Sequence, residues 1–216
     1  MKKLLLLVLA ISLFSCSKNN DDSEQIVTPS VDAIAYFRGS LNGQPLDYSQ
    51  TNYTTSAYSY SYYNGYLSGP GYFDKSYHFG CIMQPSNNTN SYPQIDLTFS
   101  NMYNTNSGVS QTDAFYGLFT TIPTNFITSI QENNLVKGIN VSYTSPSDVN
   151  YSTLKGDQTG STMTVTSSTT GIESGGNLKI ITIVGNVNCK LYNQNNPSDV
   201  IALSNGTYKL IFREAN

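Results

Sequence analysis

The chain has 216 residues, with 11 basic and 14 acidic side chains and a formal net charge of −3 at pH 7. Without residues 1–15, which contain two lysines, the net charge is −5. Such sparse and mostly negative charge argues against a nucleic-acid partner, because proteins that bind nucleic acid gather Lys and Arg on one face. After the first residues, no apolar run approaches the roughly 18 residues of a membrane helix.

The residue composition favours strands over helices. The chain contains no Trp and 17 Tyr, and it is rich in Ser, Thr and Asn. Tyr, Thr, Val and Ile suit the half-buried, pleated surface of a sheet, whereas the good helix formers Ala, Glu, Lys and Arg are scarce. The composition therefore predicts an all-β protein.

The first sixteen residues have the pattern of an export signal. Lys2 and Lys3 precede an apolar run over residues 4–11, which is too short to span a bilayer stably. The run closes with the letters LFSC, ending at Cys16. This ending resembles a bacterial lipobox, which implies removal of residues 1–15 and lipidation of Cys16 as the new N-terminus. Cys16 would then be the chain's only attachment to a membrane.

A polar, acidic stretch follows the cysteine. Residues 16–31 cannot bury a core, so we expect a flexible tether between lipid and domain. Lys18 followed by Asp21 and Asp22 resembles the export signal of surface lipoproteins in Bacteroidota. The resemblance implies an outer-membrane protein displayed on the cell surface, and the periplasmic face remains the alternative.

Short stretches of alternating apolar and polar residues recur through the rest of the chain. Asn42-Gly43 is a strong hairpin signal, and Asn205-Gly206 predicts a second turn. A run from residue 178 to 192 suits either one strand bent at Gly185 or two in sequence. The other predicted strands cover residues 32–38, 46–48, 58–62, 76–84, 95–99, 139–144, 151–154, 161–166, 200–203 and 207–213.

One helix is expected, after an apolar run over residues 114–120. Phe126, Ile127 and Ile130 have the only 3–4 spacing noted in the chain after the signal. Thr124 suits the N-cap, and Gly138 suits the end of the helix. The sequence thus predicts a single short helix between these two residues.

The pattern predicts one β-rich domain over residues 32–216. Many short strands separated by turn residues are typical of a β-sandwich or a flattened antiparallel barrel. The segments FRGSLNGQPL, VNCKLY and IALSNGTYKLIF resemble small Bacteroidota (flavobacterial-type) outer-membrane lipoproteins that carry a β-rich domain of unknown function. The resemblance implies an address and a fold class but brings no catalytic residues.

Tyrosines gather in the region from residue 48 to 77, and they are the best candidates for ligand binding. A phenol offers a flat apolar face and a polar tip, so such a cluster could stack on sugars or present an adaptable surface. The alternative is that these side chains fill the core of a domain without Trp. The candidate binding residues are Tyr58, Tyr60, Tyr62, Tyr63 and Tyr66.

Catalytic and metal sites find little support in the residue pattern. His78 is the only histidine, it lies mid-strand among aromatic residues, and no Gly-x-Ser-x-Gly elbow accompanies it. No HxxxH or CxxC spacing suggests zinc. The acids Asp96, Asp148 and Asp199 are expected in turns or facing outward, with no marked pair for glycoside hydrolysis. We therefore predict no catalytic residues, no metal and no cofactor.

The two cysteines outside the signal, Cys81 and Cys189, form an even pair in an oxidising compartment. If their strands are neighbours, a disulfide would close a long loop and stabilise the fold by roughly 4–5 kcal/mol. The alternative is that both are small buried apolar side chains.

The functional expectation is a lipid-anchored envelope protein that acts as a binding or structural surface component. A glycan, a peptide or another envelope protein would be its partner. Two alternatives remain open: a secreted-type hydrolase that uses carboxylates, and a periplasmic accessory subunit.

Overall fold

The structure is a computed structural model, and its description covers six parts of the chain. These are residues 33–52, 58–67, 75–86, 92–103, 108–128 and 137–214, without the side chains of residues 63–67, 75–76 and 102–103. The predicted signal segment, Cys16 and the tether lie outside the described residues.

Within these ranges the chain is mostly β, with one short α-helix, as the sequence predicted. The elements are β1 (Ala35–Leu41), β2 (Gln44–Gln50), β3 (Tyr58–Leu67), β4 (Lys75–Pro85), β5 (Gln94–Tyr103), α1 (Gln111–Thr120), β6 (Lys137–Thr144), β7 (Asn150–Ser152), the 3₁₀ turn η2 (Thr153–Lys155), β8 (Thr162–Ile172), β9 (Lys179–Asn193) and β10 (Val200–Arg213).

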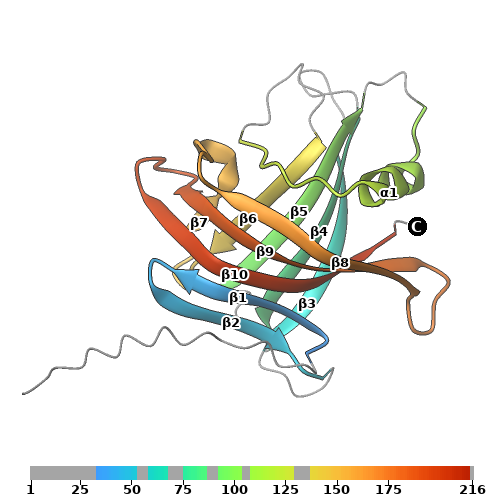
Figure 1. Cartoon of the computed structure of the whole chain (residues 1–216), viewed down its shortest axis with the longest axis horizontal. Coiled ribbons are helices and arrows are strands. Elements are labelled where there is room, and N and C mark those ends of the chain that lie inside the picture. The colour runs from blue at the N-terminus through green and yellow to red at the C-terminus, as the bar shows by residue number, and fades with distance from the viewer. Residues whose placement is uncertain are drawn as a thin grey trace, which may run out of the picture.

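All strands belong to one antiparallel sheet that nearly closes into a flattened barrel. The strand order is β2-β1-β10-β9-β7-β6-β5-β4-β3, and β8 pairs with β9 beside this path. Figure 1 shows β8, β9 and β10 crossing over β4 and β5, so the sheet folds back on itself in two layers. The two ends of the path, β2 and β3, lie close to each other and form the seam of the barrel.

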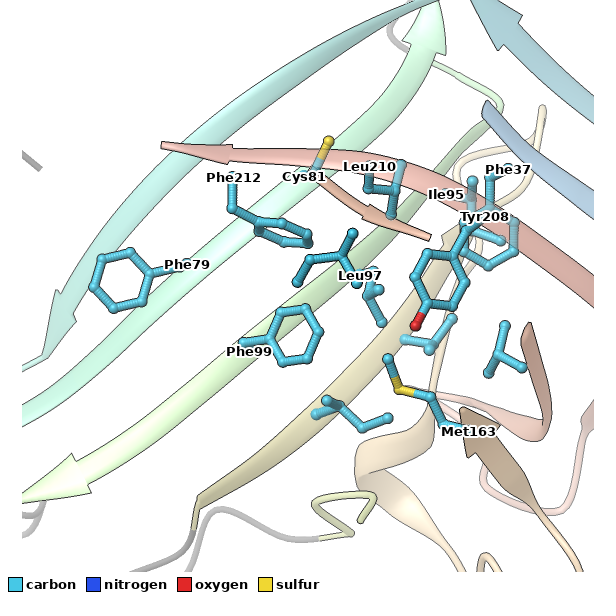
Figure 2. Close-up of a cluster of buried hydrophobic side chains, with 14 of the residues drawn as sticks. Phe37, Phe79, Cys81, Ile95, Leu97, Phe99, Met163, Tyr208, Leu210 and Phe212 are labelled. Carbon is cyan, nitrogen blue, oxygen red and sulfur yellow. The ribbon is translucent and has the colours of Figure 1, made fainter. Parts of the chain in front are cut away.

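The alternation of side chains decides which face of each strand is buried. On β4, the buried face carries Tyr77, Phe79, Cys81 and Met83, and on β5 it carries Ile95, Leu97 and Phe99, as the sequence predicted. Successive side chains in a strand point to opposite faces, so these alternate residues share one face of the sheet. That face packs against β10 across the barrel. Figure 2 shows Phe79, Cys81, Ile95, Leu97 and Phe99 of this set gathered around Tyr208, Leu210 and Phe212.

The α-helix lies earlier in the chain than the sequence predicted. α1 begins after Ser110, whose hydroxyl accepts the backbone N–H of Asp113. The Asp113 carboxylate accepts the backbone N–H of Ser110 in return. This reciprocal cap satisfies two N–H groups of the first turn. The buried residues have helical 3–4 spacing, and they are Ala114, Phe115, Leu118 and Phe119.

The expected helix after Thr124 is wrong over its described part. The backbone N–H of Ile127 donates to the carbonyl of Ile139 at 2.8 Å, so the chain here is extended beside β6. Residues 129–136 lie outside the description. Phe126 and Ile127 belong to this extended connection, which follows α1 directly.

The predicted turn at Asn205-Gly206 is also wrong, since β10 runs through it. Asn205 has a φ of 51°, and the register against β9 shifts between Leu203 and Gly206. A bulge absorbs the extra residue without ending the strand. The hairpin at Asn42-Gly43 is confirmed, with φ values of 49° and 80°.

Candidate functional site

The structure places the tyrosines of β3 at the seam of the barrel. Tyr58, Tyr60 and Tyr62 are half-buried, and they lie on the face of β3 that carries the core residues of β4 opposite them. Tyr58 and Tyr60 pack against the hydrophobic core. Tyr63 and Tyr66 belong to the same strand, but their side chains lie outside the description.

At one end of the seam, side chains link β3 to β2. The ring of Tyr58 stacks on that of Tyr48, with centroids 4.3 Å apart and planes 16° from parallel. The backbone N–H of Tyr60 donates to Oε1 of Gln50 at 2.9 Å. Burial, together with Tyr143 and Tyr58 nearby, raises the pKa of Tyr48, which therefore stays neutral.

At the other end, Tyr62 links β3 to β10 and to the end of β8. Its hydroxyl donates to the carboxylate of Glu173, and the guanidinium of Arg213 lies over its ring. The ring of Tyr58, the backbone of Tyr60 and both the ring and the hydroxyl of Tyr62 thus make contacts that close the barrel. Among the described side chains of β3, Tyr58 and Tyr62 therefore already have one ring face in contact with another group.

A groove lies elsewhere, between α1 and the hairpin of β8 and β9. Its volume is about 130 Å³. Figure 1 shows this hairpin projecting past the rest of the sheet, with α1 close to its base. The groove is lined by Phe115, Tyr116, Phe119, Thr120, Thr170, Lys179 and Ile181.

The bottom of the groove is aromatic and firmly packed. Phe115 and Phe119 meet edge to face with centroids 4.8 Å apart, and Phe119 lies 5.4 Å from Phe212 of β10. Phe115 is fully buried, and Phe119 is 8% exposed. Because these rings belong to the core, the bottom of the groove is preformed and does not need to assemble around a ligand.

The rim of the groove carries one ammonium group. Nζ of Lys179 lies 4.8 Å from the centre of the Tyr116 ring. The Tyr116 phenol beside it raises the pKa of Lys179, so this side chain is charged at neutral pH. Glu214 fixes both partners: Oε2 accepts the backbone N–H of Lys179 at 3.1 Å, and Oε1 accepts the hydroxyl of Tyr116 at 3.2 Å.

The second wall of the groove is β8, an unusually exposed strand. Residues 166–170 are all exposed, and Ile172 is 57% exposed. Thr170 pairs with Ile181, so its side chain lies on the groove side of the hairpin. Thr169 beside it points to the opposite face, as alternation in a strand requires.

His78 makes a close contact but does not form an open catalytic site. Its Nδ1 lies 2.7 Å from Oγ of Ser100 on the neighbouring strand. Ser100 is only 3% exposed, so a substrate cannot reach its hydroxyl. Burial lowers the pKa of His78, which favours the neutral imidazole.

The three acids noted in the sequence do not come together. Asp96 was expected to face outward, yet it is 8% exposed and accepts the hydroxyl of Thr98 at 3.0 Å. Asp148 is exposed in a turn with a φ of 61°. Asp199 is half-buried and accepts the hydroxyl of Tyr151 at 2.9 Å. The expectation for Asp96 was wrong, because its face of β5 is covered.

Cys81 on β4 and Cys189 on β9 are both buried and both free. The structure therefore does not contain the disulfide considered for this pair. Burial raises the pKa of each thiol to about 12. Such thiols are protonated at neutral pH and react slowly, since the thiolate is the reactive form.

The described parts of the chain contain no group of three or more His, Cys, Asp or Glu side chains that could hold a metal ion. Within the same ranges no helix is long and apolar enough to cross a membrane.

Comparison with known proteins does not identify the chain. No family model matches it, and neither the curated proteins nor the solved structures contain a match.

The sequence did not reveal the groove. Phe115 and Phe119 are four residues apart, with Tyr116 and Thr120 beside them, and this helical spacing was the available signal. The pairing of α1 with Thr170 and the start of β9 depends on the tertiary fold, which no local pattern reports.

Proposed function

We propose that the chain is a lipid-anchored protein of the bacterial outer membrane whose domain binds a polypeptide partner in the groove between α1 and β8. Two features of the sequence support the address: the lipobox-like ending at Cys16 and the acidic tether over residues 16–31. The groove supports binding, and it is the observation that carries the proposal.

The size of the groove limits what it can hold. Its volume is about 130 Å³. Pockets for cofactors and drug-sized ligands are larger, at about 300–1,000 Å³. A single apolar or aromatic side chain fits this space, and such a side chain belongs most naturally to a peptide or a protein.

The chemistry of the groove agrees with that occupant. Phe115, Phe119 and Ile181 supply apolar surface at the bottom, and Thr120 and Thr170 supply hydroxyls at the rim. A partner's side chain would bury its apolar part against the rings, where burial contributes about 25 cal/mol per Å². The hydroxyls of Thr120 and Thr170 and the ammonium of Lys179 would contact the polar backbone of the partner on either side of that side chain.

A peptide selection tests the binding function. The soluble mature chain, residues 16–216 with Cys16→Ser, is immobilised and screened against a phage library of random dodecapeptides. We expect enriched peptides with a shared apolar position. Thr170→Arg should weaken their binding by at least about tenfold, because the new side chain fills the groove.

Thr164→Arg is the matched control, since it adds the same charge to an exposed residue of β8 that lies outside residues 166–172. It should leave binding within about twofold. If no peptide is enriched, or if both variants weaken binding equally, the groove is not the binding site.

A separate experiment tests the address. Cells that express the full chain are labelled with radioactive palmitate, and the protein is recovered by immunoprecipitation. We expect label on the wild-type chain and none on Cys16→Ser. Protease treatment of intact cells should then remove the domain, and a fully protected domain would contradict surface display.

A further inference from the structure

We propose that the partner binds by strand addition: an extended peptide pairs with the free edge of β8 over residues 166–172 and places one apolar side chain in the groove. This inference rests on the proposed function, because it specifies how the same groove takes its ligand. The occupant is a segment of another protein in extended conformation.

The first observation is that, within the described residues, one edge of β8 is open. It pairs with β9 along residues 162–172, and no other described strand pairs with it. The other two strands at the ends of the path, β2 and β3, approach each other and are joined by the bond from Tyr60 to Gln50. An open edge presents a row of N–H and C=O groups that can pair with another chain.

The second observation is that the usual protections of an edge are missing from the outer half of β8. Proteins commonly place Lys, Pro or an inward-pointing charge on such strands. β8 reads TMTVTSSTTGI, without a charged residue or a proline. Its one irregularity is the register shift between Val165 and Ser167, and the residues beyond it are the exposed ones.

The third observation is that the open edge and the groove are continuous. Thr170 belongs to both, and Ile181 opposite it on β9 lies in the groove. A peptide residue that pairs with Thr170 along the open edge of β8 would lie about 5 Å from it. A long apolar side chain at that position could extend over Thr170 toward Phe119.

The register also predicts a preference for charge. Lys179 pairs with Ile172, two residues from Thr170 and on the same side of the hairpin. Its ammonium is the only cation that lines the groove among the described residues. A peptide residue two positions from the apolar one would face this ammonium, and Glu or Asp there gains the ion pair. We therefore expect an apolar residue and an acidic residue separated by one position.

The length of the edge favours a peptide over a second copy of the chain. Seven residues span about 23 Å, and a strip about 10 Å deep covers roughly 230 Å². A stable protein dimer buries about 800 Å² on each partner. A short peptide needs less, because main-chain hydrogen bonds supply much of the affinity in strand addition.

A backbone methylation scan of the tightest selected dodecapeptide tests this mode. Each N-methyl group removes one donor. Pairing along a single edge predicts that alternate positions lose binding by at least about tenfold while the positions between them lose little. Hydrogen exchange should show that alternate amides within residues 166–172 become protected when the peptide is added.

The charge preference has its own test in Lys179→Glu, which should reverse the selection from acidic to basic residues at the predicted position. Lys190→Glu, on the outer face of β9, is the control and should leave the preference unchanged.

The outcomes separate the two proposals. A peptide that is sensitive to Thr170→Arg but gives a flat methylation scan leaves groove binding in place and overturns strand addition. Protection of the β8 amides that face away from β9 before peptide is added, together with a dimer in sedimentation, would mean that a second copy occupies the edge and would also overturn it. A selection without any enriched peptide overturns both.

Discussion

The guanidinium of Arg213, at the end of β10, lies 4.9 Å from the centre of the Tyr62 ring on β3. Glu173 contacts both: its Oε2 lies 3.0 Å from Nε of Arg213, and its Oε1 accepts the hydroxyl of Tyr62. These three side chains join β3, β10 and the end of β8 at one corner of the barrel. They therefore hold the hairpin that forms one wall of the groove.

Replacing Arg213 should destabilise the domain measurably. Arg213→Met removes a cation over an aromatic ring and the partner of a carboxylate that is 28% exposed. We expect the free energy of unfolding to fall by about 1–3 kcal/mol, measured by urea denaturation of the soluble mature chain.

Lys190→Met is the control, because Lys190 forms an exposed ion pair with Asp157 at 3.8 Å. Exposed pairs contribute little, so the change should stay within about 0.5 kcal/mol. Equal losses of unfolding free energy in the two variants would mean that the contacts of Arg213 stabilise the fold no more than an ordinary surface ion pair does.

Gly185 should not tolerate even one added methyl group. A Cβ there would lie 2.1 Å from the carbonyl oxygen of Thr164 and 2.4 Å from Oη of Tyr208. Gly185→Ala forces the buried Tyr208 or the backbone of β8 to move, and we expect a loss of about 1–3 kcal/mol in unfolding free energy.

Gly171→Ala provides the comparison, since the nearest atom to its added Cβ is a side-chain carbon of Ile180 at 3.4 Å. This variant should be close to neutral. If Gly185→Ala unfolds like wild type, the packing of β8 on β9 at that position is looser than the distances indicate.

The strands were the most predictable part of the fold. β4 and β5 bury every second residue, so Phe79 and Phe99 could be assigned to the core from alternation alone. The helix was harder to predict from the sequence. The 3–4 spacing of Phe115, Leu118 and Phe119 is a helical signal, but it lies in a short apolar run that Gly117 interrupts. The capping pair of Ser110 and Asp113 was the missed evidence.

The groove could not be predicted, because it joins residues that are far apart in the chain. Phe119 and Lys179 are brought together only when β9 crosses the barrel and α1 packs on its core side. The number of tyrosines in β3 made them candidate binding residues. Their contacts, however, depend on the position of β3 at the seam of the barrel. Strand order is a long-range property that composition does not encode.

The thiols offer a simple chemical test of the core. In the soluble mature chain, Cys81 and Cys189 are the only cysteines, both buried and with a pKa of about 12. Ellman's reagent should find almost no reactive thiol in the folded protein and two per chain after unfolding without reductant. No thiol under the unfolding condition would mean that the two are bonded.

His78 should make the fold sensitive to mild acid. Burial lowers its pKa in the folded state below the value of about 6.5 expected when unfolded. Below about pH 6.5 the unfolded chain therefore holds a proton that the folded chain lacks, and acid favours unfolding. The stability of wild type should fall relative to His78→Asn as the pH decreases, until the folded pKa is reached.

The measurement is the urea unfolding free energy of both proteins between about pH 8 and about pH 5. His78 is the only histidine, and the carboxylates are common to both chains, so the difference isolates this group. Parallel curves would show that the imidazole is as easily protonated in the folded state as in the unfolded one.

The most direct test of the binding site is a map of amide chemical shifts by NMR, recorded on the soluble mature chain as the tightest selected dodecapeptide is added. Binding in the groove predicts changes concentrated in residues 115–120, 166–172 and 179–181, with little change along Tyr58 to Tyr62. Changes centred on β3, with the groove unaffected, would contradict the account and return the site to the tyrosines of the seam.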